Sequence, residues 1–170
     1  MEKILLFPNS ILRKKAEIVK KITLADLEIA ERMIKIMLRA PGVGLAANQI
    51  GILKQIVTVH LHNEVKDNDK IYTLFNPRII SYSEKKITME EGCLSLPKQF
   101  AVIERSSEIE LEYTNEKNEK VREKKSGFEA RVLQHEIDHL NGRLFIDYLS
   151  SLKRNILIKK VKKLKKTDEI

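Results

Sequence analysis

Residues 134–140 of the chain read QHEIDHL and contain the pattern H-E-x-x-H. If this stretch is helical, His135 and His139 lie one turn apart on the same face, where two imidazoles can bind one divalent metal ion. Glu136 lies one residue further round, near enough to handle protons on a metal-bound water. The pattern also arises by chance on amphipathic helices, so a metal site requires further ligands elsewhere in the chain.

Cys93 is the best candidate for a third ligand. Two nitrogens leave a catalytic site unfinished, because such a site usually has three protein ligands and one water. The chain has a single cysteine, and it follows a glycine in residues 91–95, EGCLS, a polar-flanked loop rather than an apolar run. The alternative is that this cysteine is a small buried apolar residue, as lone cysteines often are.

The flanking residues predict that the H-E-x-x-H stretch lies on a core helix. Ser126 is a candidate N-cap with Glu129 reaching back to it, and Asn141-Gly142 is a signal for the end of a helix. A helix that is held by packing can position two ligands closely, as a metal site requires. Between these ends, apolar residues recur at helical spacing at Phe128, Val132, Leu133, Ile137 and Leu140.

The rest of the chain completes one α+β domain that covers residues 1–170. Further helices are expected at 24–39, after a capping box formed by Thr23 and Asp26, and at 151–166. The other predicted segments are an extended arm at 4–12, strands at 55–61, 71–80 (broken at Asn76-Pro77), 84–89, 100–104, 107–114 and 119–125, and an extended stretch at 145–149.

Composition and charge indicate a cytoplasmic protein with a basic end. One cysteine rules out an intrachain disulfide, no stretch approaches the length of a membrane span, and the N-terminal apolar run is too short for a signal peptide. Residues 153–170 carry eight Lys/Arg against two acidic residues, a net of +6, whereas the rest carries 24 against 22, a net of +2. A basic terminal helix can dock on RNA or on an acidic surface, and a solvated helix face is the alternative. Neither a membrane nor DNA is an expected partner.

Residues 42–51, GVGLAANQIG, form a segment of small residues that lets a substrate or another backbone approach closely. Gln49 in this segment offers an amide that can both donate and accept hydrogen bonds. The pattern lacks the third glycine and the lysine of phosphate-binding loops. A substrate-binding segment and a plain connection therefore both remain as interpretations.

Three stretches together, GVGLAANQ at 42–49, EGCLS at 91–95 and QHEIDH at 134–139, resemble the three signature motifs of the peptide deformylases, in the order of that family. Asn48 departs from the proline or threonine that the family often has. The resemblance covers almost the whole chain and implies antiparallel sheets wrapped around the H-E-x-x-H helix. It implies removal of the formyl group from the N-formylmethionine of nascent polypeptides, with release of formate, in a cytoplasmic bacterial or an organellar setting. The lack of a transit peptide favours the bacterial one.

The resemblance also implies the metal site. Cys93, His135 and His139 would hold one divalent ion, Fe²⁺ natively, with Zn²⁺, Ni²⁺ or Co²⁺ able to take its place. A thiolate with two imidazoles is a soft-to-borderline ligand set that does not by itself identify the metal.

The catalytic groups follow from the same resemblance. Hydroxide formed on the metal attacks the formyl carbon, and Glu136 acts as the general acid/base. The side-chain amide of Gln49 and the backbone N–H of Leu94 donate to the oxygen that gains negative charge.

Substrate binding is expected to use strand addition. As in the family that the chain resembles, the peptide would lie as an extended strand beside the Gly44 segment, with backbone contacts from the Gly92 side. Phe128 and Val132 are candidates for the walls of the methionine pocket, with Arg131 at its edge. Plain core packing of Phe128 and Val132 is the alternative.

Two other functions compete with this interpretation. A metalloprotease would need a third ligand downstream of the helix, where no histidine follows His139 and a carboxylate such as Asp147 would have to serve. A ribosome-binding protein with a structural metal would close the site with four protein ligands, and the sequence offers three.

Overall fold

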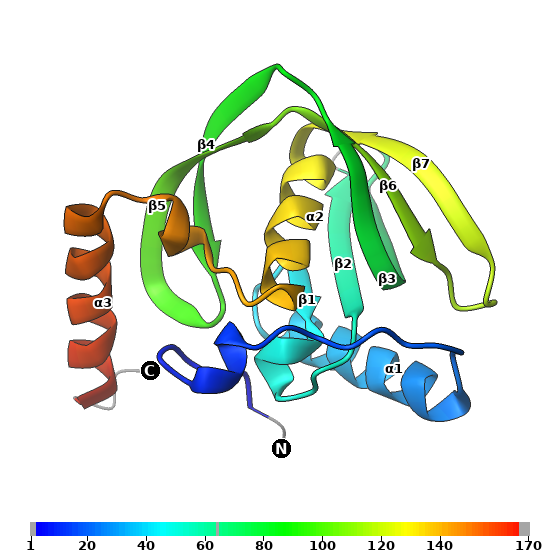
Figure 1. The fold of residues 1–170 in the computed structure, drawn as a ribbon, viewed down its shortest axis with the longest axis horizontal. Coiled ribbons are helices and arrows are strands. Elements are labelled where there is room, and N and C mark those ends of the chain that lie inside the picture. Colours follow the sequence, from blue (N-terminus) through cyan, green and yellow to red (C-terminus); the bar gives the residue numbers. More distant parts are fainter. Residues whose placement is uncertain (1–2, 64, 167–170) are drawn as a thin grey trace.

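Helix α2 (Gly127–Leu140) stands at the centre of the molecule, between two antiparallel sheets (Figure 1). The computed structural model describes residues 3–63 and 65–166. A five-stranded sheet has the order β1-β2-β3-β6-β7, and a two-stranded sheet pairs β4 with β5. The strands are β1 (Gly44–Ala46), β2 (Ile56–Asn63), β3 (Asn68–Tyr82), β4 (Lys86–Cys93), β5 (Leu96–Ser106), β6 (Glu108–Thr114) and β7 (Lys120–Ser126).

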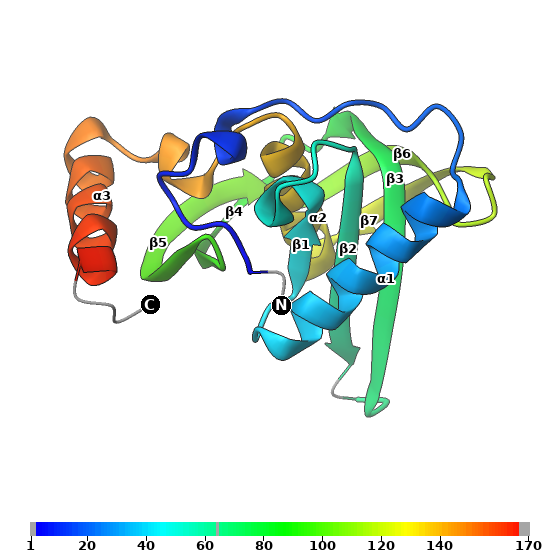
Figure 2. The ribbon, with the colours of Figure 1, turned by 90° about the horizontal axis from the view of Figure 1, so that it is seen from below.

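The five-stranded sheet is covered by a helix on each face. Successive side chains of a strand point to opposite faces, so Val57 and Val59 of β2 pack into the core that α2 shares. Ile56 lies in the other core, with helix α1 (Leu24–Arg39), which crosses the far side of the sheet (Figure 2). Burial on both faces explains why the first four residues of β2 are all buried rather than alternately buried and exposed, Thr58 included.

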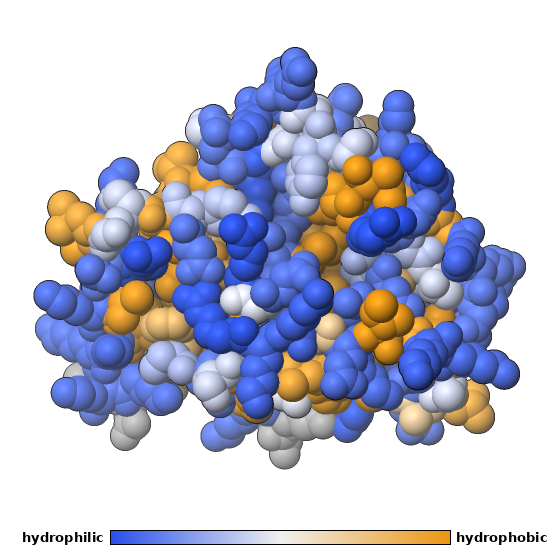
Figure 3. Space-filling model, in the orientation of Figure 1, coloured by the Kyte–Doolittle hydropathy of each residue, from blue (hydrophilic) through white to orange (hydrophobic). Residues whose placement is uncertain are grey.

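A third core joins the N-terminal arm, the β4–β5 hairpin and the C-terminal part of the chain. Leu96 and Ile103 of β5 pack there with Phe145 and with Val161 of helix α3 (Ser151–Lys166). The exposed side of α3 is basic, and hydrophilic side chains dominate that edge of the face in Figure 3. In the described part of the chain, no helix combines the length and the apolar character needed to cross a bilayer.

Most of the predicted elements are confirmed, with boundaries that differ by a few residues. Thr23 and Asp26 form the expected capping box of α1. The predicted break at Asn76-Pro77 is a register shift inside β3, where the Asn76 side chain bonds the backbone N–H and C=O of Val19. The N-terminal arm turns at Phe7 and Pro8, where the N–H of Asn9 donates to the carbonyl of Leu6, and the Asn9 side chain then caps a short 3₁₀ turn, Ser10–Arg13.

Two local predictions are wrong, the first because tertiary partners bind the Glu129 carboxylate and the second because a local hydrogen bond closes a turn. Ser126 is the N-cap of α2, but its side chain makes no capping bond, and Glu129 instead accepts from Tyr72 and pairs with Lys70 and Lys125. The stretch 145–149 was expected to be extended but forms the 3₁₀ turn η3 (Phe145–Tyr148). The Asp147 carboxylate closes that turn by accepting the N–H of Leu144 at 2.9 Å.

Candidate metal centre

The third predicted ligand meets the two histidines of α2. Cys93 ends β4, and its Sγ lies 3.4 Å from Nε2 of His139, which lies 3.3 Å from Nε2 of His135. Among the residues described, this is the one group of three such ligand atoms within 4.8 Å of one another. Zn–N and Zn–S bonds in a tetrahedral site would put nitrogens about 3.3 Å apart and nitrogen and sulfur about 3.6 Å apart. The three atoms therefore fit a shared metal ion.

The two histidines differ in their electrostatic surroundings. Burial opposes the charge of His135, but hydrogen bonds with Cys93 and Glu91 outweigh it and raise its pKa well above its usual value. The Glu91 carboxylate lies 3.0 Å from Nδ1 of His135 and can only accept there, so Nδ1 is protonated and Nε2 is the ring nitrogen that can bind a metal once it gives up its proton. Burial lowers the pKa of His139 well below its usual value and keeps that ring neutral. Its Nδ1 is buried without a hydrogen-bond partner among the residues described.

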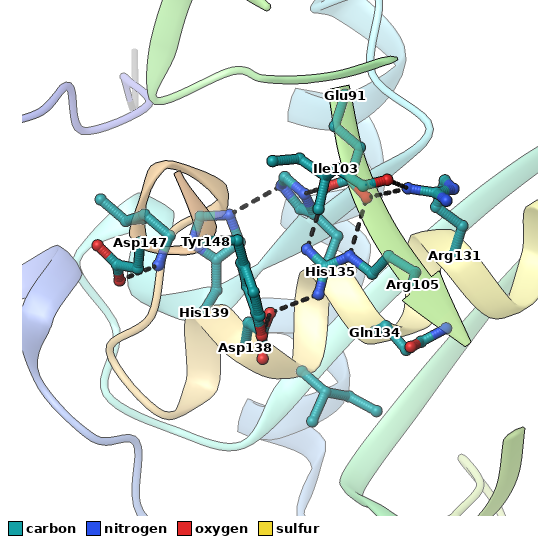
Figure 4. Close-up of polar contacts among 12 residues, drawn as sticks. Glu91, Ile103, Arg105, Arg131, Gln134, His135, Asp138, His139, Asp147 and Tyr148 are labelled. Atoms are coloured by element: carbon teal, nitrogen blue, oxygen red, sulfur yellow. Dashed lines mark hydrogen bonds and ion pairs between the residues drawn. The ribbon is translucent and has the colours of Figure 1, made fainter. Parts of the chain in front are cut away.

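Glu91 belongs to a buried charge network behind the metal site (Figure 4). Arg105 donates to it from Nε and Nη2 at 2.8 and 3.0 Å, and Arg131 donates at 2.6 Å. Burial opposes the charge, but the hydrogen bonds from His135 and Arg105 outweigh it and lower the pKa of Glu91 to about 2. Sequence reasoning missed the roles of Glu91 and Arg105. The only signal was that Glu91 opens the EGCLS stretch.

Glu136 is buried beside the three ligand atoms and lines a cavity that opens next to them. Its Oε2 has no hydrogen-bond partner in the described part of the chain, and burial raises its pKa to about 7. Gly44 of β1 allows this placement, because a Cβ there would lie 2.5 Å from Oε1 and 2.7 Å from Cγ of Glu136. A carboxyl group with this pKa can both take and release a proton near neutral pH.

Gln49 lies beside Cys93 and is held in one orientation. Its Oε1 accepts the N–H of Ala46 at 2.9 Å, which fixes the amide, and its Nε2 lies 3.1 Å from Ser95 Oγ and 3.6 Å from Cys93 Sγ. Leu94, the next residue after Cys93, lines the cavity too. The amide donor is therefore aimed at the neighbourhood of the three ligand atoms.

A cavity of about 500 Å³ opens beside the ligands, and Gly44, Gly92 and Phe128 line it. Phe128 is 48% exposed, so its alternative interpretation as a core residue is wrong, whereas Val132 lines the cavity and also belongs to the core. Arg131 lines the cavity, but its guanidinium bonds Glu91 and the carbonyls of Ile87 and Ile103 and so faces the network.

The carboxylate that a protease-like site would need is occupied. Asp147 accepts from both Nη atoms of Arg13, at 2.6 and 3.0 Å, and it is absent from the cluster of ligand atoms. The third position beside the two histidines belongs to Cys93.

Comparison with known proteins agrees with this geometry. The sequence model of the polypeptide deformylase family matches residues 1–155. The chain is 38% identical to a peptide deformylase of Rhizobium meliloti over 96% of this chain and 94% of that protein, and 41% identical to one of Pelagibacter ubique over 97% and 95%. The crystal structure of a peptide deformylase from Ehrlichia chaffeensis superposes with a TM-score of 0.92, at 36% identity over 98% of each chain. The chain belongs to the polypeptide deformylase family.

Proposed function

We propose that this deformylase hydrolyses the formyl amide of N-formylmethionyl peptides with the help of one divalent metal ion held by Cys93, His135 and His139. The observation that carries the proposal is the convergence of those three ligand atoms within 4.8 Å, beside the buried, unpartnered Oε2 of Glu136. When bound, the ion supplies Lewis acidity and makes water a nucleophile near neutral pH.

The side chains of the site divide the remaining work. Glu136 takes a proton from the attacking water at its free Oε2 and delivers it to the amine that leaves as the formyl C–N bond breaks. Gln49 Nε2 and the backbone N–H of Leu94 donate to the formyl oxygen as its negative charge grows, and each such donor is worth about a hundredfold in rate. The products are formate and a free methionyl N-terminus.

The cavity next to the ligands takes the methionine side chain. Phe128 and Val132 give it apolar walls, and the segments around Gly44 and Gly92 offer backbone to an extended peptide. A structure of the Ehrlichia chaffeensis relative is a complex with actinonin, and it covers 94% of this chain at 37% identity. We expect actinonin to compete with the peptide for the same cavity here.

We assign Fe²⁺ as the native ion, with Zn²⁺, Ni²⁺ and Co²⁺ as substitutes, in a cytoplasmic bacterial enzyme that acts as a single domain. The mixed thiolate and imidazole ligand set supports a borderline-soft divalent metal. The bacterial relatives support the setting.

The decisive experiment measures formate released from formyl-Met-Ala-Ser by anaerobically purified protein, together with its metal content. Wild-type protein should release formate, and Glu136→Ala should keep one metal per chain while losing turnover. If the wild type is fully loaded with metal and releases no formate from any formyl-peptide, the proposed reaction is wrong. Wild-type turnover by metal-loaded Glu136→Ala would instead exclude Glu136 from its proton-transfer role.

We further propose that α3 binds the ribosome through its basic side. Residues 151–166 carry eight Lys/Arg and no acidic residue. Deleting α3 would remove core residue Val161 and uncover the third core that it packs into, so charge reversal is the cleaner test. Reversal of the exposed Lys160, Lys162 and Lys166 to Glu should weaken ribosome binding and flatten its salt dependence, with formate release unchanged.

The control for this test reverses three exposed lysines elsewhere in the chain, Lys35, Lys85 and Lys117. Equal loss of ribosome binding in both variants would mean that only net charge matters, and unchanged binding in the α3 variant would refute the proposal.

A further inference from the structure

The turn η3 contacts the metal-ligand candidate His135 through Phe145, which does not line the cavity. Side chains at i and i+3 eclipse in a 3₁₀ helix, so Phe145 and Tyr148 lie on one face of this turn. The ring of Phe145, fully buried, stacks on the imidazole of His135 with centroids 6.2 Å apart and planes at 22°. Tyr148, on the same face, reaches His135 by a longer route.

That route is a continuous chain of hydrogen bonds (Figure 4). The hydroxyl of Tyr148 donates to Oδ2 of Asp138 at 2.7 Å, and the same oxygen accepts from Nη1 of Arg105 at 2.6 Å. Arg105 then donates through Nε and Nη2 to Glu91, which accepts the proton of His135 Nδ1 at 3.0 Å. Four steps therefore separate the phenol from the ring that faces the metal.

Within this chain of hydrogen bonds, the orientation of Arg105 depends on contacts with Asp138 and Tyr148. Its guanidinium is planar, so fixing one edge fixes the direction of the other. Asp138 accepts a hydrogen bond from Nη1, and the guanidinium carbon lies 4.8 Å from the centroid of the Tyr148 ring. Burial and the hydrogen bond to Asp138 raise the pKa of Tyr148 to about 12, so its hydroxyl keeps its proton and donates at neutral pH.

Burial divides this chain of hydrogen bonds into an inner and an outer part. Glu91 and Arg105 are buried, whereas Asp138 is partly exposed and Tyr148 is 45% exposed. An exposed tyrosine adds little to the core, so its defined contacts with Asp138 and Arg105 call for another explanation.

We propose that Tyr148 is a positioning residue for the metal site: through Asp138, Arg105 and Glu91 it fixes the orientation and tautomer of His135. This inference rests on the proposed metal ligands. Outer partners of metal-bound histidines typically change metal affinity or activity by about 10- to 100-fold, and a partner several bonds further out should act at the lower end of that range.

The test compares Tyr148→Phe with a matched control, Tyr113→Phe. Tyr113 also donates its hydroxyl to a carboxylate, that of Glu123 at 3.0 Å, but on the distant β6–β7 pair. Tyr148→Phe should weaken Co²⁺ binding about tenfold in chelator competition. It should also shift the visible absorption bands of the cobalt-loaded protein and lower kcat with KM unchanged, while Tyr113→Phe should do none of these.

A double-mutant cycle then asks whether Tyr148 acts through Asp138. Asp138→Ala removes the acceptor, so adding Tyr148→Phe to it should weaken cobalt binding no further. Additive losses would overturn the proposed route, and a Tyr148→Phe protein with wild-type cobalt affinity and spectrum would overturn the positioning role. A wild-type protein that binds no cobalt would refute the proposed ligands themselves, and the inference with them.

Discussion

Replacing Gly44 by alanine tests whether the buried Glu136 must occupy its observed position. A Cβ built on Gly44 lies 2.5 Å from Oε1, 2.7 Å from Cγ and 2.8 Å from Cδ of Glu136. Carbon atoms in contact sit about 3.5 Å apart, so Cγ has to retreat by about 0.8 Å. Because Glu136 is buried on α2, packing opposes such a shift, and the carboxyl group turns away from the ligands.

The expected consequence is a loss of turnover rather than a loss of metal. A misplacement near 1 Å in a catalytic group costs about a hundredfold, which corresponds to about 2.7 kcal/mol in the barrier. Gly44→Ala should therefore lower kcat for formate release from formyl-Met-Ala-Ser about a hundredfold. Its metal content should equal that of the wild type.

Gly42→Ala is the matched comparison. Its Cβ would meet only Leu94 at close range, 2.7 Å from the terminal Cδ1, and a terminal methyl can rotate away. We expect a loss smaller than about tenfold for that variant. A Gly44→Ala enzyme with nearly wild-type kcat would refute the reasoning. A loss confined to KM would show that Gly44 serves only the approach of the substrate.

Three further perturbations have defined outcomes. Cys93→Ser should abolish the thiolate-to-cobalt absorption band and weaken cobalt binding, as measured by titration against a chelator; an unchanged band would exclude Cys93 as a ligand. Arg131→Met should lower the free energy of unfolding, measured in urea, by about 3 kcal/mol, because it removes a cation from buried Glu91. The control Arg78→Met loses an exposed ion pair with Glu112 and should lower it by less than about 1 kcal/mol. Burial opposes the charge of Asp26, but hydrogen bonds from Lys54 and Thr23 lower its pKa below the usual 3.8. Its contribution to folding stability is therefore present above that pH and is lost as the pH falls through the folded-state pKa. Asp26→Ala should thus be about 1–2 kcal/mol less stable than the wild type at pH 7, and this difference should shrink in acid unfolding experiments; a constant difference would contradict the assignment.

Several features of the site follow from local sequence alone. The i, i+4 spacing places His135 and His139 on one face, and the apolar positions around them predict the helix that carries them. The capping box of α1 is likewise a matter of neighbouring residues. Local geometry decides these features, because backbone periodicity acts over a few residues.

Tertiary structure decided which distant groups meet. Only the packing of β4 against β5 and α2 brings Cys93 to the histidines and Glu91 to Nδ1 of His135. Glu129, predicted to cap α2, instead accepts a hydrogen bond from Tyr72 and pairs with Lys70, both on β3. These outcomes depend on contacts between residues far apart in the chain.

The sequence and the tertiary structure decided different features of this protein. The sequence determined the residue types of the proposed ligands and the helix that presents two of them, because residue type and spacing are local properties. The turn at Phe145–Tyr148 was expected to be extended, and its contacts with His135 and Asp138 appear only in the folded molecule. An uncharged ring and a hydroxyl carry no signal of their partners until packing selects them, and this selection is what tertiary structure adds.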